Sequence, residues 1–143
     1  MAQRAGPAER LIPAGTMPPM QPDSVGNSMF VTPFVEGRRL TLRLRGPSIN
    51  ERESFIITNE ASKSIETADD VCSFLVLDMQ EISFISSMGI GMLLDLRKRA
   101  AARDMKIVLS NVGDQLYTLL SIVKLEKLLS VCTSERDLKR ALR

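Results

Sequence analysis

Polar and apolar residues alternate strictly through residues 39–45, where three leucines lie on one side of an extended chain and four polar residues on the other. A period of two predicts a half-exposed β-strand. The preceding apolar segment, residues 30–35, contains Pro33, which cannot donate to a strand ladder and therefore favours a sheet edge. Gly37 lies between the two segments and suits a turn, so together they predict an N-terminal β-hairpin.

From residue 71 onward, strand-like apolar segments alternate with segments of helical periodicity. Residues 71–77 are predominantly apolar, which predicts a central parallel strand covered on both faces. Further strands are predicted at residues 106–109 and 128–132. Helices are predicted at about residues 88–103, after Asp114, and after a cap formed by Ser134 and Asp137. This order predicts an α/β fold with a mixed, mainly parallel sheet, an N-terminal hairpin and crossover helices.

Two of the helices have predictable buried faces. Ser48, with Glu51 three residues later, resembles a capping box that opens the first helix. The residues assigned to its buried side are Phe55, Ile56, Ala61, Ile65 and Ala68. In the helix at 88–103, helical spacing assigns to the core Ile90, Leu93, Leu94 and Ala101.

The first 28 residues differ in composition from the rest of the chain. Five prolines and three glycines interrupt them, and they lack a periodic apolar pattern that would offset the entropy cost of ordering. We expect residues 1–28 to be a flexible Pro/Gly-rich tail or a misplaced start. One folded domain is expected over residues 29–143.

Composition narrows the functional classes. The chain has 143 residues, of which 19 are basic and 17 acidic, and this near-balance argues against nucleic acid as the main partner. Histidine is absent, which removes the commonest general base and the commonest metal ligand. We therefore expect a binding protein rather than an enzyme, with no catalytic residue, metal site or cofactor.

The cysteines and the hydropathy bear on location. Cys72 and Cys132 each lie in an apolar run, which favours buried thiols in a reducing compartment, although a bridge between them stays open. No apolar run is long enough to cross a bilayer, and the N-terminus lacks the apolar stretch of a signal peptide. The expected location is cytoplasmic, without membrane insertion.

Two serines, Ser86 and Ser87, stand where a predicted strand gives way to a helix. The first N–H groups of a helix lack intrahelical partners, a hydroxyl can accept one of them, and the positive pole there tolerates negative charge. A phosphate at this place would add about −1.5 to −2 charges to the surface while the fold survived. The junction is therefore a candidate switch, with plain helix capping as the structural alternative.

Two glycines follow in the first turn of the same helix. Gly89 and Gly91 bracket Ile90, and glycine inside a helix costs about 1 kcal/mol relative to alanine. Their presence indicates that another group approaches the backbone closely. Either the helix's own strand or a docked partner fits this pattern.

The stretch ISFISSMGIGMLLDL, preceded by FLVLDM, resembles the signature of STAS domains, the sulfate-transporter and anti-sigma factor antagonist family. The residues that carry the resemblance are Asp78, Ile82, Phe84, Ser86, Ser87, Gly89, Ile90 and Gly91. Downstream, IVLSNVGDQLYTLLSIVKLEKLL is similar to the family's strand, short helix and terminal strand. The resemblance extends over about residues 29–143 and is strongest to small bacterial anti-sigma factor antagonists.

This resemblance implies a binding cycle. Such proteins bind an anti-sigma serine kinase and free its sigma factor; the kinase phosphorylates the motif serine, and a phosphatase, here expected to be of the PP2C type, resets the antagonist. Ser87 falls on the phosphoacceptor position. Ser86 stands where the family usually has an acidic residue, and its hydroxyl makes it a competing candidate for phosphorylation. The implied partner-binding residues are Ser86, Ser87, Met88, Gly89, Ile90 and Gly91. Met88 departs from the small residue that is usual at its position.

Other interpretations stay open. The chain could be a STAS scaffold subunit of a lipid-transport complex without phosphorylation, or a small-molecule sensor with its ligand at the strand ends. A serine hydrolase is set aside because no histidine is available for a triad. The basic cluster at residues 97–99 is either a site for an acidic partner or a solvated face. Asp78 either forms hydrogen bonds near the switch or is a plain loop residue.

Overall fold

The computed structural model describes residues 30–143, so the predicted tail at 1–28 lies outside the described residues. The strands are β2 (Val31–Glu36), β3 (Arg39–Leu44), β4 (Ser48–Ile49), β5 (Phe74–Asp78), β6 (Phe84–Ile85), β7 (Lys106–Ser110) and β8 (Ser130–Val131). The helices are α1 (Glu51–Thr67), α2 (Ser87–Ala102), α3 (Asp114–Ile122) and α4 (Glu135–Ala141), with a short 3₁₀ helix at Leu125–Lys127.

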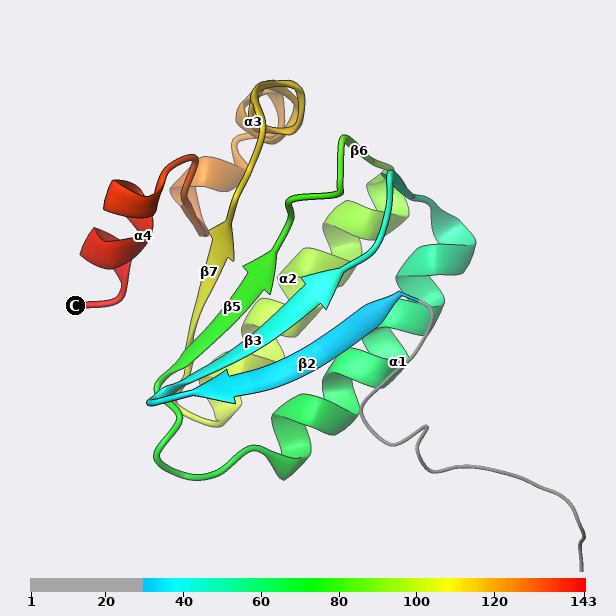
Figure 1. Cartoon of the computed structure of the whole chain (residues 1–143). Coiled ribbons are helices and arrows are strands. Elements are labelled where there is room, and N and C mark those ends of the chain that lie inside the picture. Colours follow the sequence, from blue (N-terminus) through cyan, green and yellow to red (C-terminus); the bar gives the residue numbers. More distant parts are fainter. Residues whose placement is uncertain (1–29) are drawn as a thin grey trace, which may run out of the picture.

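The strands form one main sheet and one small one. The main sheet has five strands in the order β2-β3-β5-β7-β8, and only β2 runs antiparallel to its neighbour. The two-residue strands β4 and β6 pair in parallel apart from it. Figure 1 shows α1 and α2 side by side on one face of the main sheet. The predicted α/β fold, with its mainly parallel sheet and crossover helices, is confirmed.

The hairpin is also confirmed. β2 and β3 pair from Val31 opposite Leu44 to Glu36 opposite Arg39, and Gly37 has a φ of 57° in the turn between them, a conformation that glycine adopts without strain. Pro33 lies in the edge strand as expected. The leucines of β3 are all buried beneath α1 and α2, with exposures of 3% or less: Leu40, Leu42 and Leu44.

The central strand β5 is covered on both faces, as its apolar sequence predicts. Leu75 and Leu77 belong to the main core, while Val76 joins a smaller cluster with Val108 and Cys132, covered by Leu138, Ala141 and Leu142 of the α4 segment. The strand starts later than the predicted residue 71, because the Cys72 N–H donates to the Asp69 carbonyl in a turn. Val71 is consequently 59% exposed.

The predicted cap of α1 is wrong. Ser48 belongs to β4, which it forms with Ile49 by pairing with β6, so the helix begins only at Glu51. Asn50 is the N-cap, and the Glu53 carboxylate accepts its backbone N–H at 3.0 Å.

The predicted buried faces of α1 and α2 need correction. In α1, Ile57, Ala61 and Ile65 face the sheet, and Phe55, about 200° around the helix from Ile57, is 80% exposed. In α2 the buried residues are Gly89, Met92, Leu93, Leu96 and Ala100, whereas Leu94 and Ala101 are exposed. Apolar residues lie on several faces of each helix, so spacing alone did not single out the face against the sheet.

Near the C-terminus, the last predicted strand is shorter than expected. A 3₁₀ helix and a turn occupy much of residues 125–129, which leaves only Ser130–Val131 in β8 and Leu128 51% exposed. The predicted cap of α4 is confirmed, since the Ser134 hydroxyl accepts the Asp137 N–H at 3.2 Å.

Candidate functional site

The two serines of the strand-to-helix junction have different structural roles. Ser86 is the N-cap of α2, and its hydroxyl accepts the Gly89 N–H at 3.3 Å. Its own backbone N–H donates to the Ile49 carbonyl at 2.8 Å, which fastens the start of α2 to β4. Ser86 is half-buried and its hydroxyl is engaged, as the capping interpretation expects.

Ser87 is the first residue of α2 and is exposed. Within residues 30–143, its hydroxyl forms no hydrogen bond to another protein group. Among the described residues, therefore, no group is hydrogen-bonded to this oxygen as a general base would be.

Ser87 lines an apolar groove between the N-terminal parts of α1 and α2. The groove has a volume of about 940 Å³. Apolar side chains from both helices line it, namely Phe55, Ile56, Met88 and Met92. Polar residues complete the lining: Glu51, Arg52, Ser54, Thr58, Ser87 and Asp95, with the backbone of Gly91.

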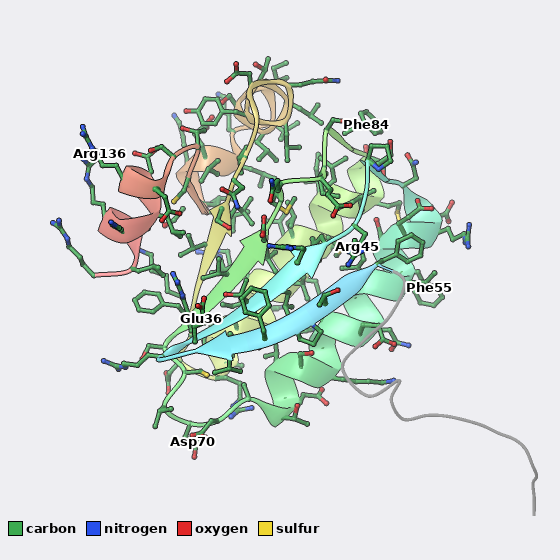
Figure 2. The ribbon with its side chains drawn as sticks, in the orientation of Figure 1. Glu36, Arg45, Phe55, Asp70, Phe84 and Arg136 are labelled. Atoms are coloured by element: carbon green, nitrogen blue, oxygen red, sulfur yellow. The ribbon has the colours of Figure 1, made fainter. Side chains whose placement is uncertain are left out.

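The groove exposes large apolar side chains. Phe55 is 80% and Met88 56% exposed, so most of their surface contacts water. Phe55 lies on α1 at the end of the domain where β2 begins (Figure 2). Phe84 of β6, which is 42% exposed, lies at this same end. An apolar groove with a polar rim is the usual form of a protein-binding surface.

The predicted partner-binding residues separate into two groups. Ser87, Met88 and Gly91 face the groove. Ser86 and Gly89 point inward, and half-buried Ile90 packs against the main core. Phe55 and Arg52 are groove residues that the sequence did not indicate; the exposed phenylalanine was assigned to the core because it is apolar.

The two glycines also differ in their surroundings. A Cβ atom on Gly89 would collide with Ile85 Cγ1 and would lie 3.1 Å from Ile49 Cγ2, so this glycine lets α2 pack on β4 and β6. A Cβ atom on Gly91 would have nothing within 4 Å. Of the two explanations, packing against the helix's own strand applies to Gly89, while Gly91 adds open surface to the groove.

The charges around the start of α2 are sparse. The first turn contains no acidic residue, and the unpaired N–H groups there carry partial positive charge. Asp95, farther along the groove, is paired with Arg99 at 2.8 Å, and this hydrogen bond and ion pair raise the pKa of Arg99. Across the groove, Glu51 and Arg52 form no ion pair within the described residues. A negative group on Ser87 would therefore meet no like charge in its own helical turn.

Asp78 is a buried structural residue and not a plain loop aspartate. Its carboxylate accepts Arg43 Nε, the Gln80 N–H and Asn111 Nδ2, each at 3.1 Å. These groups come from the ends of three neighbouring strands, since Arg43 of β3 lies opposite Asp78 in the register and Asn111 follows β7. No hydrogen bond joins Asp78 to Ser86 or Ser87 in the described region.

The basic cluster at residues 97–99 is exposed on α2. Arg99 pairs with Asp95, and Arg97 Nε donates to the Leu128 carbonyl at 3.1 Å. Two of the three cations are therefore occupied by contacts within the domain, which fits a solvated face better than a dedicated acidic-partner site. Among residues 30–143, no helix combines the length and the apolarity needed to span a membrane.

A sequence profile described as "STAS domain" matches residues 31–138, and the chain belongs to the STAS domain family. No curated protein sequence matched the chain significantly. Several solved structures, in contrast, are similar to this chain.

An anti-sigma-factor antagonist (STAS) domain protein from Planctomyces limnophilus superposes with a TM-score of 0.68 at 14% identity, over 81% of this chain and 100% of that one. The Bacillus cell fate determinant SpoIIAA in its phosphorylated form gives a TM-score of 0.55 at 18% identity, over 78% and 98% of the two chains. The murine anion transporter Slc26a9 gives 0.60 at 22% identity, over 71% of this chain and 17% of the transporter. Similarities at these identities establish a shared STAS fold.

Proposed function

We propose that this STAS domain is an anti-sigma factor antagonist whose binding is switched off by phosphorylation of Ser87. The observation that carries the proposal is that Ser87 is exposed, lines an apolar groove and has a hydroxyl without a hydrogen bond to any described residue. The partner would be an anti-sigma factor that is itself a serine kinase, and its capture would release a sigma factor in the cytoplasm. Two of the structural neighbours are an anti-sigma-factor antagonist domain protein and SpoIIAA in its phosphorylated form, and both likenesses support this proposal.

The proposed switch works through charge. In the unphosphorylated state, Met88 and Phe55 offer apolar surface to the kinase, and their burial stabilises the complex. Phosphoryl transfer forms a bond from Ser87 Oγ to the γ-phosphorus of ATP while the bond to ADP breaks. The kinase's base takes the hydroxyl proton, because no described residue of this chain forms a hydrogen bond with the Ser87 hydroxyl. About −1.5 to −2 charges then stand at the groove rim, and the partner would have to desolvate them to stay bound.

The fold should survive this modification. Ser87 is exposed, and the N-terminal pole of α2 favours negative charge by roughly 0.3–1 kcal/mol. The cap that holds the helix start is the Ser86 hydroxyl, which stays free to accept the Gly89 N–H. A PP2C-type phosphatase would hydrolyse the phosphoserine and restore the binding surface. In this cycle the chain is a substrate and a ligand, not an enzyme.

Labelling with radioactive ATP and an anti-sigma serine kinase from the same genome tests the assignment. The parent and the Ser86→Ala variant should both incorporate phosphate, whereas Ser87→Ala should incorporate none. Equal labelling of Ser87→Ala and the parent would refute Ser87 as the acceptor. The Ser86→Ala arm is the matched control, because it removes the neighbouring hydroxyl.

Binding of Ser87→Asp to the same kinase tests the mechanism. We expect an intact fold by circular dichroism and at least tenfold weaker binding by calorimetry. Unchanged affinity of a folded Ser87→Asp protein would contradict charge gating.

A constitutive STAS scaffold is the second candidate. Bulky Met88 beside the acceptor and the likeness to the transporter Slc26a9 favour it. If the partner is a lipid-transport complex, we expect the Ser87→Asp variant and the parent to assemble with it equally well. A gene neighbourhood with transporter subunits and no kinase would support this alternative.

The groove also offers a candidate ligand site for a small-molecule sensor, between α1 and α2 at the edge of the sheet where β3 and β5 end. A thermal-shift screen with nucleotides and lipids would raise the melting temperature if a ligand bound there. No response across the screen would count against the sensor.

A further inference from the structure

The groove between α1 and α2 is uncovered by the rest of the domain. Phe55 and Met88 project into solvent from opposite walls, and no side chain from residues 30–143 outside these two helices lines it. Single exposed apolar residues are ordinary, but here a phenylalanine and two methionines share one concavity. Burying such side chains against an apolar partner is favourable. The groove is therefore suited to an apolar occupant.

The chain enters the domain at the same end as this groove. Helices that connect parallel strands run opposite to them, so α1 and α2 both begin at the edge of the sheet where β3 and β5 end. β2 is antiparallel to β3, so it begins at this edge too. The Arg45 N–H donates to the Phe30 carbonyl at 2.9 Å, and only a short connection separates Arg45 from the first turn of α1. Phe30, the first described residue, therefore lies at the end of the domain that holds the groove, and α1 contacts β2 (Figure 1).

The segment that precedes Phe30 contains a suitable occupant. Residues 17–20 read Met-Pro-Pro-Met, with an apolar side chain at each position. Proline fixes its backbone φ, so such a sequence loses little entropy on binding, and proline-rich segments commonly dock on grooves with aromatic residues. Methionine fills irregular apolar gaps and contacts aromatic rings favourably through sulfur. Nine residues separate Met20 from Phe30 and can span up to roughly 30 Å, about three helix diameters.

We propose that residues 17–20 of this same chain dock in the groove, against Phe55 and Met88, and compete there with the partner protein. The docking itself is independent of the proposed function. Its regulatory consequence rests on that function, because an occupied groove would shield the surface beside Ser87.

Because residues 17–20 belong to the same chain as the groove, even weak intrinsic binding would be enough to occupy it. A short linker holds the segment at an effective concentration in the millimolar range. Even an intrinsic dissociation constant of about 1 mM would then fill the groove in roughly half of the molecules or more. The affinity for the partner protein would fall in proportion to the fraction of molecules whose groove is unoccupied. Replacing Met17 and Met20 should therefore raise this affinity about two- to tenfold.

Methyl NMR of the full-length chain, labelled at methionine methyl carbons, tests the docking. In a Met17→Ser/Met20→Ser variant, the methyl signals of Met88 and Met92 should move. The signals of Met79 and Met105, which are 0% and 4% exposed in the core, should stay in place and report an intact fold. A matched control, Leu11→Ser/Ile12→Ser, removes two apolar side chains from the same segment and should leave Met88 unmoved. Phe55→Ala should move Met88, and adding the two serine substitutions to it should move Met88 no further.

Three results would overturn the proposal. The first is unchanged Met88 and Met92 signals in the Met17→Ser/Met20→Ser variant. The second is an equal shift in the control variant. The third is a Met88 shift that disappears on dilution, which would identify a second copy as the occupant. If the kinase leaves Ser87 unmodified while the methyl signals move as expected, the phosphorylation cycle fails and the docking stands. If the kinase modifies Ser87 and the methyl signals stay fixed, the docking alone fails.

Discussion

Replacing Gly89 and Gly91 by alanine should change stability in opposite directions, although the two glycines lie two residues apart in α2. A Cβ atom on Gly89 would collide with Ile85 Cγ1 and would lie 2.9 Å from Ile85 Cδ1 and 3.1 Å from Ile49 Cγ2. Both isoleucines are buried, with exposures of 2% or less, so neither can swing into solvent. A Cβ atom on Gly91 would meet nothing within 4 Å.

The magnitudes follow from two opposing effects. Alanine is favoured over glycine in a helix by about 1 kcal/mol, and this gain is similar at both positions. Overpacking a filled core costs about 1–3 kcal/mol, and it applies only to Gly89. Gly91→Ala should therefore stabilise the domain by about 1 kcal/mol, and Gly89→Ala should destabilise it by up to about 2 kcal/mol. Since the helix gain cancels in the comparison, the two variants should differ by about 1–3 kcal/mol.

Urea unfolding followed by far-ultraviolet circular dichroism measures this difference directly, with the parent chain as reference. Both unfolding curves should keep the slope of the parent, so that a changed midpoint reports a changed stability. An equal stabilisation of both variants would refute the reasoning, because it would show that Ile85 and Ile49 yield without cost.

Three further predictions concern single contacts. Ser86→Ala removes the acceptor of the Gly89 N–H and should cost about 1 kcal/mol in thermal unfolding, while Ser87→Ala should change stability by less than about 0.5 kcal/mol. Asp78→Ala leaves Arg43 and its other donors without their acceptor and should cost about 1–3 kcal/mol; a melting temperature equal to the parent's would contradict this. Burial, with help from Asp137, raises the pKa of the Cys132 thiol. The protonated thiol's contribution to stability is thus fully present below about pH 8.5 and is lost as the pH rises through the folded pKa, and Cys132→Ala should flatten this alkaline decline in urea melts.

The longer elements could be located from the sequence, although the buried faces of α1 and α2 could not. The alternation at residues 39–45 gave β3, and the start of α2 was located to within one residue. β4 and β6 have only two residues each, which is too short for any period to appear; their pairing depends on β6 arriving beside β4 in the folded chain. Because Ser48 takes part in this pairing, it does not serve as the N-cap of α1, as the sequence had predicted.

The site was only partly predictable for a similar reason. The serine pair could be found locally, because a helix N-terminus has chemical needs that its own sequence reveals. The opposite wall of the groove comes from α1, and nothing near Phe55 in the sequence shows which way it points. The ion pair of Asp78 likewise joins Arg43 across 35 positions and depends on strand register.

The two edges of the main sheet limit how copies of this protein can associate. Because Phe30 and Arg45 form a hydrogen-bonded pair, the missing N–H of Pro33 falls on the outer side of β2, where an incoming strand would need a donor. At the opposite edge, β8 offers only two residues for pairing. Neither side is a good template for β-sheet extension, so crowding many copies together should not by itself seed fibrous aggregates through these strands.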